Sequence, residues 1–336
     1  MLRQVTHTQP PICIRVPSFR SPRNETNPQA PGNLKYFSIK KDILATLAYF
    51  DLFRYPLKKK EIFSYLGHCD DFSEFEQALD HLLQEGLVYR MADFYCLEKN
   101  LELVRDRRKS NEKARGLLKK AETAARIIAA FPYVKAVAIS GSLSKNCADE
   151  NSDIDFFIVT SANRLWIART LLHLFKKICF LFNLQNYFCM NYFIDEAEPE
   201  ILEKNIYTAI ETATLMPLCG KKTFRHFLDS NAWAKNFLPN HGFPPIPAKE
   251  INGNWIRYGI EKLLSQPFGD RLDNRLMRLT SKRWDAKTAA HQKNSKGLLM
   301  GLHTGRHFAK PDPSVFQKKI MQRYEQRLQE VFRQYA

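Results

Sequence analysis

The spacing of apolar positions changes along the chain and divides it into four segments. Residues 1–37 show little periodicity and contain six prolines, so we expect a disordered tail. Residues 38–100 show helical spacing in three short runs, 38–50, 59–66 and 73–85, followed by alternation over 87–97 that predicts a hairpin. A proposed N-cap, Ser38, starts the first of these helices. We therefore expect a small helical domain over 38–100.

The order helix, helix, helix, hairpin resembles the winged helix-turn-helix domain. In that family the third helix enters the major groove, and its Lys and Arg side chains contact phosphate. Here the third helix carries no Lys or Arg and four acids, Glu74, Glu76, Asp80 and Glu85. DNA binding through this helix is therefore not expected, and a packing or protein-interaction role is favoured.

Strands and helices alternate from residue 101 onward. A charged helix is predicted over 101–130, apolar strands over 137–140 and 156–159, a helix over 164–182, a third strand over 187–194 and a helix over 196–218. After a proline-rich connector, 239–247, the spacing predicts helices over 253–266, 270–284 and 313–335. The expected fold is α+β (mixed α/β), with a small mixed sheet over 101–220 and a mainly helical C-terminal region over 221–336.

The most informative stretch is 136–159, AVAISGSLSKNCADENSDIDFFIV. An apolar run ends at Gly141-Ser142, and Asp153 and Asp155 open the next apolar run. Residues two apart in a strand point the same way, so the two carboxylates are expected on one face, where they repel unless a cation lies between them. Oxygen ligands beside phosphate suit Mg²⁺. Gly141 permits close backbone approach, and Ser142 offers a hydroxyl and an N–H to an anion.

This arrangement resembles the signature of the DNA polymerase β-like nucleotidyltransferase superfamily: an apolar strand, Gly-Ser, a gap, then Asp-x-Asp in an apolar strand. The resemblance covers about residues 115–220. It implies that a nucleoside triphosphate lies against Gly141-Ser142, that Asp153 and Asp155 hold Mg²⁺, and that an acceptor attacks the α-phosphorus. Lys145 could reach the triphosphate, or be a solvated loop lysine.

The family's third carboxylate, from a later strand, is not obvious here. The strand 187–194 has no acid in its interior. Asn191 occupies one candidate position and cannot act as a base, whereas Asp195 borders the strand end and is the candidate we name. A nucleotide-sensing regulator or a catalytically degenerate scaffold therefore remains as an alternative to an active transferase.

Charge adds a second feature. The net charge is +16, and most of the excess lies C-terminal to the Asp pair. Arg271, Arg275, Arg278 and Lys282 are spaced to share one helix face. This stripe could bind a triphosphate or an acidic acceptor, although a solvated basic face is the plainer interpretation.

Cysteine use and hydropathy favour a cytoplasmic protein. The seven cysteines are scattered and form no Cys-x-x-Cys pair, so reduced thiols are expected. No apolar run reaches the length of a membrane span, and no membrane partner is expected. The acceptor and the base of the triphosphate are not legible from these residues.

Overall fold

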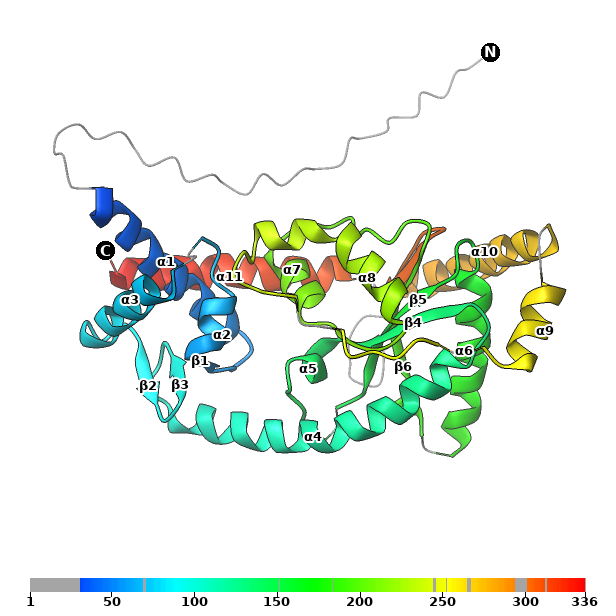
Figure 1. The fold of residues 1–336 in the computed structure, drawn as a ribbon, viewed down its shortest axis with the longest axis horizontal. Helices are drawn as coiled ribbons and strands as arrows, with labels where there is room; N and C mark the ends of the chain where they lie inside the picture. The colour runs from blue at the N-terminus through cyan, green and yellow to red at the C-terminus, as the bar shows by residue number, and fades with distance from the viewer. Residues whose placement is uncertain are drawn as a thin grey trace, which may run out of the picture.

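The computed structural model describes residues 31–68, 71–150, 152–182, 184–243, 246–251, 253–264, 267–293, 301–311 and 313–335. These residues form the predicted mixed α/β fold, with eleven α-helices, a six-stranded mixed sheet and a separate three-stranded sheet (Figure 1). Residues 1–30, most of the predicted disordered tail, lie outside the described residues.

The N-terminal unit contains three helices and the smaller sheet. Its first helix begins at Pro31, seven residues before the predicted cap, so Ser38 lies inside the helix. Proline is tolerated in a first turn because its missing N–H has no partner there. The elements are α1 (Pro31–Asp51), β1 (Leu57–Lys58), α2 (Lys59–Ser64), α3 (Phe72–Gln84), β2 (Tyr89–Met91) and β3 (Phe94–Cys96). The three helices and the hairpin follow the predicted order, strand β1 is an addition that pairs with β3, and the likeness of this unit to a winged helix stays a prediction.

The larger sheet has the strand order β7-β4-β5-β6-β9-β8. Only β5 and β6 are parallel to each other, joined by helix α6 (Leu165–Leu181), and the other neighbours are antiparallel. The strands are β4 (Val134–Ile139), β5 (Asp155–Thr160), β6 (Cys189–Asp195), β7 (Met216–Cys219), β8 (Leu302–Thr304) and β9 (Phe308–Pro311). This order places β4, β5 and β6 at the centre, where both faces can be covered.

Two sequence expectations for this region are corrected. The predicted helix over 196–218 is limited to α7 (Ile206–Ala213), and Met216–Cys219 forms strand β7 instead. Strand β7 is an edge strand, the position in which Pro217 is tolerated in a sheet. The C-terminal region also contributes the hairpin β8–β9, which extends the central sheet, although its alternation is too short to stand out in the sequence.

Helices cover both faces of the sheet, because neighbouring residues of each strand face opposite ways. Val137 and Ile139 of β4 pack with α4 (Leu101–Ala129) and α6 (Leu165–Leu181). Ala136 and Ala138 pack with α8 (Lys221–Ser230). The remaining elements are α5 (Gly141–Ser144), η1 (Gln185–Tyr187), η2 (Ala232–Asn236), α9 (Trp255–Leu263) and α10 (Phe268–Ala289).

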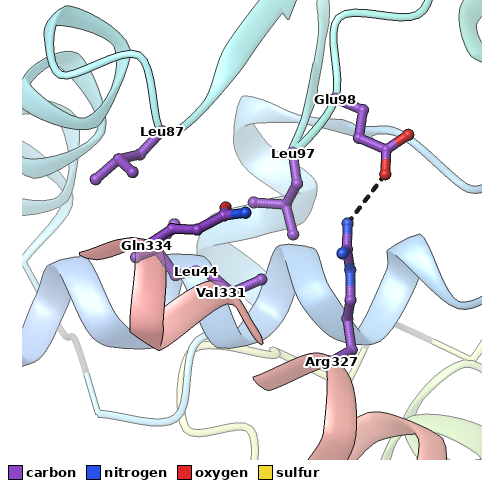
Figure 2. A pocket seen from close by; sticks show the side chains of 7 residues that line it. All are labelled: Leu44, Leu87, Leu97, Glu98, Arg327, Val331 and Gln334. Carbon is purple, nitrogen blue, oxygen red and sulfur yellow. Dashed lines mark hydrogen bonds and ion pairs between the residues drawn. The ribbon is translucent and has the colours of Figure 1, made fainter. Parts of the chain in front are cut away.

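The last helix, α11 (Pro313–Tyr335), returns to the N-terminal unit and packs along α1. Arg327 binds Asp51 at 2.8 Å and Glu98 at 3.2 Å. Beside it lies a cavity of about 100 Å³, lined by Leu44, Leu87, Leu97, Glu98, Arg327, Val331 and Gln334 (Figure 2). The two ends of the described chain therefore share one core.

Candidate active site

The turn after β4 is pressed against the start of β5. Gly141 has φ +68°, a left-handed conformation that favours glycine. A Cβ added at Gly141 would lie 2.8 Å from the Oδ2 atom of Asp155. The backbone N–H of Ser140 donates to the Asp155 carbonyl at 2.9 Å, which fixes this approach. The positive φ therefore favours glycine at this position, and a Cβ here would also require the Asp155 carboxylate to shift.

The two aspartates flank one buried residue. Both aspartates were predicted to lie within one strand. Strand β5 begins at Asp155, so Asp153 lies just before the strand. Ile154 between them is fully buried, and both carboxylates are partly exposed, which places the pair on the side opposite Ile154. The Ile154 N–H donates to Asn186, and its carbonyl accepts from Cys189, so the extended backbone is held on the β6 side.

The residue beside Asp155 on the next strand is Cys189. The parallel register pairs these two residues, so their side chains share a face. Burial, followed by the negative charge of Asp155, raises the pKa of the Cys189 thiol to about 12, and the thiol hydrogen-bonds Asp155. Asn191 lies where the register shifts between Phe156 and Phe157. Neither position supplies a third carboxylate.

Asp195 does not join the pair, which corrects the sequence expectation. It pairs with Thr160 at the far end of β5, five residues along the strand from Asp155, or about 17 Å at the usual rise. Its buried carboxylate accepts from the N–H groups of Asn163, Ala197 and Glu198 and lies 2.9 Å from His307 Nδ1. These bonds satisfy Asp195 as a structural residue that closes the far end of the sheet.

Lys145 lies at the predicted site, with Gly141 and with Glu211 of α7. Its Nζ donates to the Gly141 carbonyl at 3.1 Å and to Glu211 Oε1 at 2.9 Å. Burial and then the charges of Glu211 and Asp155 raise the pKa of Tyr207, so the Tyr207 ring lies within the field of both carboxylates. Glu211 was not identified from the sequence, because only folding brings it to a lysine 66 residues away.

The N-terminal unit contacts the same loop. The Tyr55 hydroxyl donates to the Lys145 carbonyl, and the Arg107 guanidinium lies 3.4 Å from the centre of the Tyr55 ring. Arg107 in turn binds Glu61 at 2.8 Å. The loop that carries Ser142 and Lys145 is thereby supported from α2 and α4. Ser142 itself is exposed and available to a ligand.

The two aspartate side chains could supply part of the coordination shell of one divalent cation. Asp153 and Asp155 offer oxygen ligands on one side, which leaves other coordination positions to water and phosphate, as Mg²⁺ usually has in proteins. Among the described residues, no group of three His, Cys, Asp or Glu side chains could hold a metal. A cation bound here would therefore need further oxygen atoms from water or from its substrate.

The remaining predicted feature lies elsewhere. Arg271, Arg275, Arg278 and Lys282 are on α10, whose Asp270 contacts the residues that follow the far end of β5. There Arg164 binds Asp270, and Tyr133 donates its hydroxyl to Leu264 at 3.2 Å. The stripe is thus not part of the aspartate site.

Comparison with known proteins identifies a family for the middle of the chain. The model of the family described as "Nucleotidyltransferase domain" matches residues 121–211, which include β4, β5, β6 and most of α7. No curated protein and no solved structure matches the chain. No described helix is both long and apolar enough to cross a membrane.

Proposed function

We propose that the chain is a Mg²⁺-dependent nucleotidyltransferase, which moves a nucleoside monophosphate from a nucleoside triphosphate to an acceptor. The observation that carries this proposal is the Gly141 turn against Asp155, with Asp153 on the same side, inside the matched range 121–211. The exposed Ser142 hydroxyl and the loop around it provide donors for the β- and γ-phosphates. Bound Mg²⁺ would neutralise charge on the phosphates.

The reaction that fits this site is an in-line displacement. The acceptor oxygen or nitrogen forms a bond to the α-phosphorus, the bond to the β-phosphate oxygen breaks, and pyrophosphate leaves with the electron pair. The nucleophile gives up one proton. The Cys189 thiol, with a pKa of about 12, already holds its proton at neutral pH and cannot accept another.

Glu211 is the carboxylate that we propose as proton acceptor. It is linked to the Gly141 turn through two short contacts, from Glu211 to Lys145 and from Lys145 to the Gly141 carbonyl. A triphosphate at Ser142 would attract the Lys145 ammonium, which would then release Glu211. Lys145 is thus assigned to the phosphates and Glu211 to the attacking group.

Labelling with α-³²P nucleoside triphosphates tests the function. Each triphosphate is incubated with the full chain, Mg²⁺ and a cell extract, and the labelled product is identified. Transfer is expected with wild type and lost with Asp155→Asn. A matched control is Asp229→Asn, because Asp229 is exposed on α8, away from the site. Equal labelling by wild type and Asp155→Asn would refute the proposal.

The lack of a third acid beside Asp155 on β6 favours one alternative, a nucleotide-sensing or catalytically degenerate domain. In that case Mg²⁺-dependent triphosphate binding would persist, measured as a rise in melting temperature, while no labelled product forms. EDTA should abolish the thermal shift for an active transferase and for a nucleotide sensor alike. Only the formation of a labelled product distinguishes these two functions.

A further inference from the structure

Helix α10 separates its charges between two faces. The acids of its first half point at α6: Asp270 binds Arg164, and Asp273 accepts from the Ile167 N–H at 2.8 Å. Leu272 and Leu276 pack into the cluster beneath. The outward face therefore keeps its positive charges without the acids that could have balanced them.

Four cations occupy that outward face. Arg271, Arg275, Arg278 and Lys282 are all exposed, and within the described part of the chain none of their side chains makes a hydrogen bond or an ion pair. Arg271, Arg275 and Arg278 line, together with Asn274, a depression of about 500 Å³. Successive cations are about 4.5–6 Å apart along the helix axis. Such a row can follow a chain of phosphates, and guanidinium groups bind phosphate in a bidentate manner.

Exposed aromatic rings lie on the neighbouring helix. Trp255 and Tyr258 of α9 are 83% and 68% exposed and, three residues apart, share a face. The inward face of α9 holds it in place, because Arg257 donates to the Val134 carbonyl at 2.9 Å and to Glu261 at the same distance. These rings are therefore displayed from an anchored helix rather than from a loose one.

We propose that α9 and α10 form a docking surface for single-stranded nucleic acid. A cationic row that follows the backbone and aromatic rings on which bases stack are the two elements that such ligands require. An anionic membrane fits less well, since Leu272 and Leu276 of α10 face the core and its exposed apolar residues, Phe268 and Leu279, lie about 16 Å apart along the helix axis. The surface is separate from the aspartate site, because α9 binds the start of β4, beside the end of β5.

The test is fluorescence anisotropy of the full chain with a fluorescein-labelled oligouridylate in EDTA, so that no transfer occurs. Arg275→Glu combined with Arg278→Glu is expected to weaken binding at least about tenfold and to lower the salt slope by about 0.7 per lost phosphate contact. The matched control is Lys318→Glu combined with Lys319→Glu, two exposed lysines of α11 that change the net charge equally. This control is expected to change binding by less than about twofold, because screening limits charge effects to about 10 Å.

Two further variants separate the contributions. Trp255→Ala is expected to weaken binding about tenfold by removing one stacked base. Asp155→Asn is expected to bind the oligouridylate like wild type. The binding test therefore does not depend on the proposed transfer reaction, and either proposal can fail while the other holds. Circular dichroism checks that each variant is folded.

Three outcomes would overturn the proposal. Equal weakening by the α10 and α11 charge reversals would show a non-local charge effect. Competition by inorganic polyphosphate as strong as that by unlabelled oligouridylate, with no effect of Trp255→Ala, would show an anion site without base contacts. Binding to phosphatidylserine vesicles without binding to oligouridylate would assign the face to a membrane.

Discussion

Replacing Gly141 by alanine tests the geometry of the aspartate site most directly. The alanine must adopt φ near +68°, which costs an L-residue about 1–2 kcal/mol. Its Cβ would also lie 2.8 Å from Asp155 Oδ2, and overpacking of this kind costs typically about 1–3 kcal/mol. The free energy of unfolding should therefore fall by about 2–5 kcal/mol, unless the Asp155 carboxylate moves away.

Either response damages transfer. A displacement of the carboxylate by about 1 Å is enough to lower a rate about 100-fold, so Gly141→Ala should reduce turnover at least that much under conditions where it is still folded. Urea unfolding measures the stability, and transfer of labelled monophosphate measures the turnover. The matched control is Gly116→Ala in α4, where an added Cβ meets nothing within 4 Å. Helix propensity predicts that this control gains about 0.5–1 kcal/mol.

A double-mutant cycle separates the two costs. In an Asp155→Ala background the carboxylate is gone, so Gly141→Ala should cost only the backbone part, about 1–2 kcal/mol. Wild-type stability and turnover in Gly141→Ala would refute the close approach of the turn to Asp155. An unchanged cost in the Asp155→Ala background would show that the carboxylate is not the obstacle.

Three further predictions use other parts of the structure. Glu211→Gln should lower kcat more than about 100-fold with little change in KM; a change in KM alone would make Glu211 a binding residue. The Cys189 thiol should resist iodoacetamide at pH 8, and Asp155→Asn should accelerate the reaction, because removing the negative charge lowers the raised thiol pKa; equal rates would contradict that link. Val331→Ala should cost about 1–2 kcal/mol in urea unfolding and the exposed Gln329→Ala close to none, whereas equal effects would argue against a shared core of α1 and α11.

The local parts of the site could be predicted from the sequence. The apolar runs around Gly141 and Asp155 have strand periodicity. The residues of a short motif are close together in sequence, so their chemistry can be inferred without knowing the position of the strand in the sheet. The start of α1 at Pro31 and the strand β7 were not predicted, because only packing against the rest of the protein selects them over the alternatives.

The error at Asp195 has a simpler cause. A helix joins β5 to β6, and such a crossover implies parallel strands. The start of β6, not its end, must then lie beside Asp155, so Cys189 and not Asp195 was the position to examine. Glu211 could not be found this way, since α7 follows β6 through a loop of unknown direction.

The contact between α1 and α11 has a consequence for the order in which the protein acquires structure. The core around α1 includes Val331, together with Ala213 and Leu238 from the middle of the chain. During synthesis, the first helix leaves the ribosome long before its last partner has been made. Contacts so distant in sequence form slowly, so the nascent N-terminal unit exposes apolar surface that a chaperone could bind. Ribosomes stalled before residue 313 should therefore carry this unit in a protease-sensitive form, and release of the complete chain should protect it.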